Sequence, residues 1–148
     1  MNNKIPPPLV TLICGLAIYY SQIFFPNTQT SLGNLIAIAL LLLGITIMVT
    51  AVLSFKKQGT TVNPLQPEKA SSLVVSGLFN YSRNPMYFAM LLILLSLTAK
   101  FNVVGGLVIT LAFVIFMTKF QIIPEELALE RKFGKQFTQY KEKTRRWI

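Results

Sequence analysis

Four apolar segments are separated by polar connections along the chain, and this pattern predicts a bundle of membrane helices. The segments are Leu9–Phe25, Leu32–Phe55, Met86–Ala99 and Val103–Ile123. A helix needs about 20 apolar residues to cross a bilayer, so the third segment is short for a span. We expect it to gain length from residues from Phe79 onward and to form a helical hairpin with the fourth. Gly105 and Gly106 would let the two arms approach closely.

The first apolar segment has a second interpretation, as a cleaved signal peptide. We regard this as weaker, because Ser21–Pro26 lacks the small-x-small pattern of a cleavage site. A shorter apolar piece, Ser72–Phe79, interrupts the polar connection that follows the second segment. It is too short to span a bilayer and is typical of a re-entrant or interfacial segment.

Beyond Ile123 the apolar positions adopt a helical period. They recur at spacings of four, four and three residues, at Leu129, Phe133, Phe137 and Tyr140. Pro124 suits a first helical position, and Glu125 and Glu126 favour a helix N-terminus. The remaining positions are rich in Lys and Arg. This pattern predicts one cytosolic amphipathic helix that lies on the membrane surface.

The basic residues are unevenly distributed about the apolar segments. Of 14 Lys and Arg, four lie in 56–85 and eight from Lys119 onward, whereas the opposite turns contain only Lys100. The positive-inside rule then places the long connection, the C-terminal helix and both termini in the cytosol. Topology and anionic headgroups explain the net charge of +9, so no nucleic-acid partner is expected. We predict an all-α, multi-pass integral membrane protein with four membrane segments, which lies in the cytoplasmic membrane if the host is prokaryotic.

Composition narrows the possible chemistry. A chain of 148 residues usually forms one domain. Its 53% hydrophobic and 13% charged residues are unlike those of a soluble domain. It has no histidine and one cysteine, Cys14, inside an apolar segment. These counts disfavour a zinc site, a Ser-His-Asp triad and a disulfide framework, and we expect no metal.

Two polar clusters, Ser82–Tyr87 and Pro124–Leu127, lie at the ends of apolar segments on the same side of the predicted bundle. Charged groups are costly there without partners, so we expect the clusters to face each other across one pocket. Each also has a simpler interpretation. Arg83 alone suits a topology anchor, the two glutamates a helix start, and the tyrosines an interfacial aromatic belt.

Taken in order, the motifs resemble a known enzyme family. They are Ser76-Gly77-Leu78-Phe79, Arg83-Asn84-Pro85-Met86-Tyr87, Pro124-Glu125-Glu126-Leu127, Phe133-Gly134, Tyr140 and Arg145-Arg146-Trp147. This set resembles the isoprenylcysteine carboxyl methyltransferase family, whose superfamily includes the phospholipid N-methyltransferases. The resemblance covers the chain from about Thr60 onward. The chain departs from the family pattern at Asn84, where the family has histidine, and at Ala89, where it has glycine.

The resemblance implies S-adenosylmethionine as methyl donor and S-adenosylhomocysteine as product. The residues it assigns to donor binding are Asn84, Pro85, Tyr87, Glu125, Glu126 and Tyr140. Carboxylates can accept bonds from ribose hydroxyls, and tyrosine rings can lie against the sulfonium. It also implies one methyltransferase domain over 1–148, with the first two membrane helices in 1–57 and the cofactor-binding and catalytic half in 58–148.

Arg83 is the predicted catalytic residue, because a guanidinium holds a carboxylate through paired bonds. A carboxylate needs no general base, which is compatible with the absence of histidine. The predicted methyl acceptor is therefore a carboxylate, such as an isoprenylcysteine-type C-terminal carboxyl. We expect this lipophilic acceptor to arrive from the bilayer. A phospholipid amine and a lipophilic thiol are the alternatives. The non-enzyme alternatives are a membrane adaptor and a small four-helix transporter, and the latter lacks a carboxylate at mid-depth.

Overall fold

The computed structural model describes residues 5–25, 30–59 and 72–148, and these residues form helices and no strand. The elements are α1 (Pro7–Ser21), α2 (Ser31–Lys57), the 3-10 turn η2 (Gly77–Asn80), α3 (Pro85–Phe101), α4 (Val103–Met117), the π-helical turn η3 (Thr118–Ile122), α5 (Ile123–Phe133) and α6 (Lys135–Lys143). The all-α prediction is confirmed. Part of the predicted polar connection, 60–71, lies outside the described residues.

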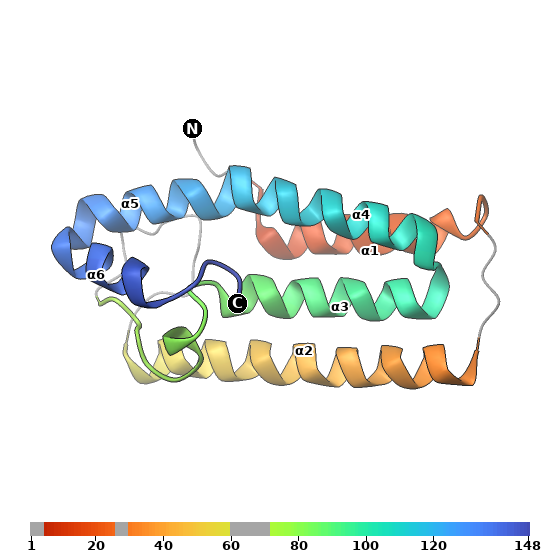
Figure 1. The fold of residues 1–148 in the computed structure, drawn as a ribbon, viewed down its shortest axis with the longest axis horizontal. Coiled ribbons are helices and arrows are strands. Elements are labelled where there is room, and N and C mark those ends of the chain that lie inside the picture. Colours follow the sequence, from red (N-terminus) through yellow and green to blue (C-terminus); the bar gives the residue numbers. More distant parts are fainter. Residues whose placement is uncertain (1–4, 26–29, 60–71) are drawn as a thin grey trace.

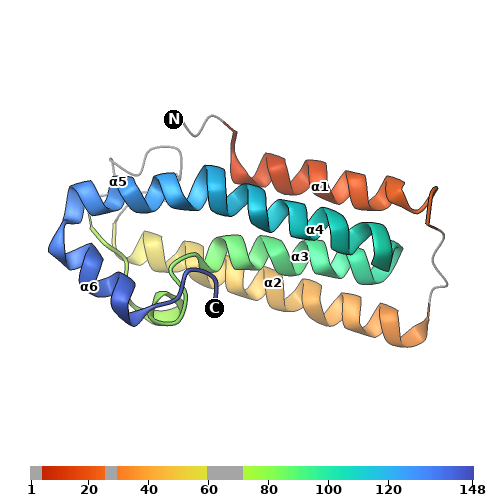
Figure 2. The ribbon, with the colours of Figure 1, turned by 45° about the horizontal axis from the view of Figure 1, so that its top comes forward.

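Helices α1, α2, α3 and α4 lie side by side with α3 in the middle (Figures 1 and 2). Helix α3 carries no charge before Lys100, and none of its 17 residues is exposed. The three surrounding helices instead turn rows of large apolar side chains outward, among them Leu12 on α1, Leu42 on α2 and Leu111 on α4. An apolar outer surface on every flanking helix suits a hydrocarbon environment.

Two helices are long and apolar enough to cross a membrane. They are α2, with 27 residues, and the continuous helix Val103–Phe133, with 31 residues, which contains α4, η3 and α5. The apolar part of the second helix ends at Ile123, so its last residues project beyond that part. Helices α1 and α3 are apolar but have 15 and 17 residues. The prediction of four membrane segments therefore stays a prediction for these two.

Helix α3 begins at Pro85, so the expectation that it recruits residues from Phe79 onward is wrong. Proline disfavours helical backbone at the residue before it, and Asn84 has φ −130° and ψ 53°. Pro85 itself suits the first turn, because the missing N–H would have no partner there. Phe79 lies in η2, where Gly77 has φ +64° and begins the turn.

The region after Ile123 also differs from the predicted single amphipathic helix. It continues α4 through the π-helical turn η3, in which the Ile123 N–H bonds the Thr118 carbonyl five residues earlier. Pro124 explains this turn, because it lacks an N–H and its ring would crowd the Phe120 carbonyl in a regular helix. The amphipathic stretch then breaks at Gly134, whose φ of +52° suits glycine and separates α5 from α6.

The apolar face of α6 is covered by the protein itself. Phe137 is 1% exposed and packs with Tyr140 against Ala51, Val74 and Phe79. The prediction that this face lies on the lipid surface is therefore wrong. The helix closes the end of the bundle where α2 ends and α3 begins (Figure 1).

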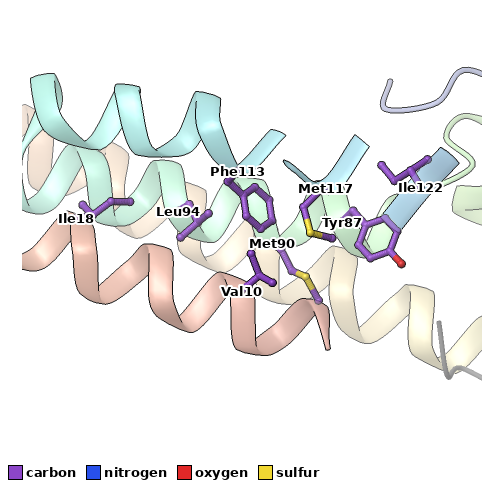
Figure 3. Close-up of a cluster of buried hydrophobic side chains, with 8 residues drawn as sticks. All are labelled: Val10, Ile18, Tyr87, Met90, Leu94, Phe113, Met117 and Ile122. Carbon is purple, nitrogen blue, oxygen red and sulfur yellow. The ribbon is translucent and has the colours of Figure 1, made fainter. Parts of the chain in front are cut away.

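A second apolar cluster runs along the middle of the bundle (Figure 3). Its buried members are Val10, Ile18, Tyr87, Met90, Leu94, Phe113, Met117 and Ile122. The ring of Tyr87 belongs to this cluster, while its hydroxyl points away from the other labelled side chains (Figure 3). Tyr87 therefore joins the apolar interior of the bundle to its polar end.

The predicted hairpin of α3 and α4 is present, and Asn102 makes its turn. The Asn102 side chain accepts a hydrogen bond from the Gly105 N–H at 3.0 Å, capping α4. Its amide also donates to the Ser21 carbonyl at 3.1 Å, which ties the end of α1 to the turn. The arms of the hairpin approach closely at Gly106, as predicted, whereas Gly105 approaches Ser21 of α1 instead. A Cβ on Gly106 would lie 2.6 Å from Oγ1 of Thr98.

We predict that Gly106→Ala destabilises the protein by about 1–2 kcal/mol. Overpacking costs about 1–3 kcal/mol, which outweighs the gain of about 1 kcal/mol in helix propensity. Thr98 has little freedom to move away, because its hydroxyl bonds the Leu94 carbonyl at 2.9 Å. Thermal unfolding in detergent measures the change.

Gly15→Ala is the matched control for this substitution. A Cβ at Gly15 would meet only the flexible end of Leu97, at 3.1 Å from Cδ1. The control variant should therefore unfold at or above the wild-type temperature. Equal effects of the two substitutions would contradict the close-packing explanation.

Candidate functional site

The two polar clusters meet where α3 begins and α5 begins. The Tyr87 hydroxyl donates to Oε2 of Glu125 at 2.8 Å. Arg83 contacts Oε1 of Glu126 through Nε and Nη2, both at 3.1 Å. Residues about 40 positions apart in sequence thus form two parallel contacts, as the predicted common pocket requires.

A cavity of about 250 Å³ lies beside these contacts. It is lined by Pro7, Pro8, Phe55, Phe79, Arg83, Asn84, Pro85, Met86, Tyr87, Met90 and Glu125. Most of this wall is apolar, and the polar groups come from the start of α3 and from α5. Of the residues predicted to bind the donor, Asn84, Pro85, Tyr87 and Glu125 line the cavity. Glu126 and Tyr140 are absent from its lining.

The two adjacent glutamates have opposite electrostatic environments, beyond the apolar part of their helix. Burial raises the pKa of Glu125 to about 7, the Tyr87 hydrogen bond opposes this, and the neighbouring Glu126 charge adds to it. For Glu126, burial raises the pKa, but the hydrogen bonds and charges of Arg146 and Arg83 outweigh it and lower the pKa overall. Glu126 is therefore a structural anion, whereas Glu125 can exchange a proton near neutral pH.

The guanidinium of Arg83 is fully engaged within the protein. Besides its contacts to Glu126, its Nη1 donates to the Thr144 carbonyl and, at 3.1 Å, to the Lys141 carbonyl. The Arg83 side chain is 11% exposed. The guanidinium thus lines the cavity but directs its donors to α5 and to the end of α6. Its predicted role in holding an acceptor carboxylate stays untested.

Tyr140 lies in the apolar cluster under α6. Its hydroxyl donates to the Phe79 carbonyl at 2.7 Å, and burial raises its pKa to about 12. Because Phe79 lines the cavity, Tyr140 supports the wall from behind. Its predicted contact with the donor stays a prediction.

Comparison with known proteins identifies the family of the chain. The family described as phospholipid methyltransferase matches residues 32–136. The chain belongs to the phospholipid methyltransferase family. An uncharacterized protein of Haemophilus influenzae (strain ATCC 51907 / DSM 11121 / KW20 / Rd) is 40% identical over 63 residues, which are 43% of this chain and 100% of that protein. No solved structure matches the chain. The resemblance seen in the motifs is confirmed, and the family supports a membrane methyltransferase.

Sequence reasoning gave no role to one residue that the structure places in the ion-pair cluster around Glu126. Arg146 binds both oxygens of Glu126, through Nε at 3.2 Å and Nη2 at 2.8 Å. Its carbonyl also accepts a bond from Nδ2 of Asn84 at 2.9 Å. The Arg-Arg-Trp motif at the chain end was a signal, but spacing alone does not say which arginine turns inward.

We predict opposite effects on stability from the isosteric changes Glu126→Gln and Glu125→Gln. Glu126→Gln should cost about 3 kcal/mol at pH 7, since it leaves two guanidiniums without their anion. Stability from Glu126 is present above the usual pKa of a glutamate and is lost as pH falls through its lowered pKa. This variant should therefore differ least from the wild type in acid.

Glu125→Gln should stabilise the protein above pH 7. The folded form of the wild type binds the Glu125 proton more tightly than the unfolded chain, so stability falls as pH rises from about 4.5 to about 7. The glutamine side chain still accepts the hydrogen bond from Tyr87 but cannot ionise, so this loss of stability does not occur. Thermal unfolding between pH 5 and 8.5 measures both variants. A common pH dependence for the two would contradict the division of roles between the glutamates.

Proposed function

We propose that this protein transfers a methyl group from S-adenosylmethionine to a lipophilic acceptor, and that the acceptor group is an amine. Family membership supports the methyl transfer. The observation that favours the amine is the half-buried carboxyl of Glu125, which lines an apolar cavity beside Tyr87 and forms no ion pair among the described residues.

The cavity wall suits the reacting end of the methyl donor. When bound, S-adenosylmethionine supplies an electrophilic methyl group on a sulfonium cation. Tyr87 offers an aromatic ring and Glu125 an anion, both of which attract a cation in an apolar site. A volume of about 250 Å³ is below the roughly 300–1,000 Å³ of whole-ligand pockets. We therefore assign the cavity to the region around the sulfonium and not to the entire donor.

The engagement of Arg83 weighs against the carboxylate acceptor favoured by the sequence. An isoprenylcysteine-type carboxyl would need the guanidinium to exchange Glu126 or two carbonyls for the substrate. Breaking a part-buried ion pair is costly. An amine needs no such exchange, since it arrives as a cation that Glu125 can pair with.

With an amine acceptor, Glu125 would accept the proton that the ammonium loses. An ammonium must lose a proton before its nitrogen becomes a nucleophile. The group that takes this proton works best when its pKa lies near the working pH. The pKa of Glu125, raised to about 7 by burial, meets that condition. Oε2 is bonded to Tyr87, and Oε1 has no hydrogen-bond partner among the described residues, so Oε1 is the atom we assign to the proton.

The arrangement of the bundle supports entry of a lipophilic acceptor from the bilayer. Helices α1 and α3 lie alongside the two helices that are long enough to span, so we propose that all four segments share the same slab (Figure 2). The described chain ends, Ile5 and Ile148, then lie on the cytosolic side with the cavity. The exposed cations at the bundle end, such as Lys57, Lys132 and Lys143, suit that side.

The first test is binding followed by acceptor chemistry, with the protein in lipid nanodiscs. Calorimetry should detect S-adenosylmethionine binding to the wild type. With a labelled methyl group, lipophilic amines should give a base-stable product, whereas a carboxylate acceptor would give an ester that base hydrolyses. Glu125→Gln should lower turnover by about 100-fold, because general-base contributions are of that order.

Glu142→Gln is the matched control, since Glu142 is an exposed carboxylate on α6. It should transfer methyl groups at the wild-type rate. A base-labile product would restore the carboxylate acceptor and Arg83 as its binding residue. If the wild-type protein is folded in a bilayer and binds no S-adenosylmethionine, the enzyme proposal is contradicted, and the transporter and adaptor alternatives are favoured.

A further inference from the structure

The last five residues of the chain connect three elements at the site. The segment Thr144–Ile148, called the tail below, runs beside the loop before α3, where Ser82 and Arg145 form a parallel bridge and the Arg83 N–H donates to the Arg145 carbonyl at 2.9 Å. At its far end the indole of Trp147 donates to Thr118 of η3 at 3.2 Å. Between these two contacts lies Arg146.

Arg146 contacts two residues that neighbour the cavity. Its guanidinium is the described partner of Oε2 of Glu126 and shares Oε1 with Arg83. Its carbonyl is bonded to the side-chain amide of Asn84, which is 8% exposed and lines the cavity. The side chain of Arg146 itself is 38% exposed and does not line the cavity.

The geometry of a helix links Glu126 to Glu125. Successive residues of an α-helix point about 100° apart, because there are 3.6 residues per turn. When Glu126 is held by its two arginines, Glu125 on the same turn is directed to Tyr87 and to the cavity. Any rotation of α5 that released Glu126 would also turn Glu125 away from Tyr87.

We propose that Arg146 is a positioning residue for the site. Through Glu126 it sets the orientation of Glu125, and through its carbonyl it sets that of Asn84. This inference rests on the proposed function, in which Glu125 and Asn84, the two residues that Arg146 orients, line the donor cavity. Arg83 alone cannot do the same, since it contacts a single oxygen of Glu126 and leaves Oε2 free to swing.

The test compares Arg146→Gln with Arg145→Gln in nanodiscs. The Arg145 side chain is exposed and makes no hydrogen bond or ion pair in the described structure, so its replacement removes the same charge one residue away. Arg146→Gln should lower kcat/KM for methyl transfer by about 10- to 100-fold, the size expected for a misplaced group. Arg145→Gln should leave it unchanged. Arg146→Lys should recover part of the loss, as it keeps the charge but not the paired bonds.

A second measurement reads the position of Glu125 without any turnover. A hydrophobic carbodiimide modifies protonated carboxyls in apolar sites, and mass spectrometry locates the adduct. Wild-type protein should be labelled at Glu125 and not at Glu126, because Glu126 is ionised and paired. The labelling ratio is the yield of the Glu125 adduct in a variant divided by its yield in the wild type. In Arg146→Gln this ratio should fall at least several-fold, and in Arg145→Gln it should match the wild type.

The single tryptophan of the chain, Trp147, reports whether the tail stays in place. Its fluorescence and the thermal unfolding of each variant show that the protein is folded. If Arg146→Gln does not fold, Arg146→Lys carries the same test with a smaller expected change. Wild-type labelling ratios and kcat/KM in a folded Arg146 variant would overturn the proposal. A wild type that transfers no methyl group would refute the proposed function, while the labelling ratio would still decide the role of Arg146.

Discussion

The site depends on one carboxylate shared by two guanidiniums. Glu126 is 6% exposed and holds Arg83 from the loop before α3 and Arg146 from the tail. An anion in so dry a place would be very unfavourable alone, and so would the buried guanidinium of Arg83. Arg146, which is partly exposed, supplies the second cation. The three residues come from three segments that are far apart in sequence. Their contacts set where α5 begins relative to α3, and so form the polar end of the bundle.

This arrangement separates two neighbouring glutamates into different chemical states. Glu126 receives both cations and stays ionised, whereas Glu125 faces an apolar cavity and, among the described residues, has the Tyr87 hydroxyl as its one hydrogen-bond partner. Pairs of titratable groups with such contrasting surroundings are how proteins place a proton-exchanging group beside a fixed charge. The π-helical turn before Pro124 lies directly upstream. It is where the apolar helix changes into the segment that carries both glutamates.

The bundle places this polar end reproducibly because α3 is enclosed on all sides. Two of its partners approach it closely at a glycine, α2 at Gly44 against the Ala89 carbonyl and α4 at Gly106 against Thr98. At the opposite end Asn102 ties α1 to the α3–α4 turn. With both its flanks and its far end held, α3 presents Tyr87 at a constant depth. A membrane offers no hydrophobic force between helices, so such close contacts and buried hydrogen bonds are what keep them together.

By itself the sequence determined the helical class, the apolar segments, the α3–α4 hairpin and the family, because these follow from local composition and ordered motifs. It also indicated that the clusters around Arg83 and Glu125 would meet, since both lie at the same end of the predicted bundle. Only the tertiary structure decided which cation each carboxylate receives, that Arg146 and not Arg145 turns inward, and that Phe137 faces the protein instead of lipid. Spacing along a chain cannot distinguish these choices. Each depends on which group is nearest once distant segments have packed, and on how little water remains between them.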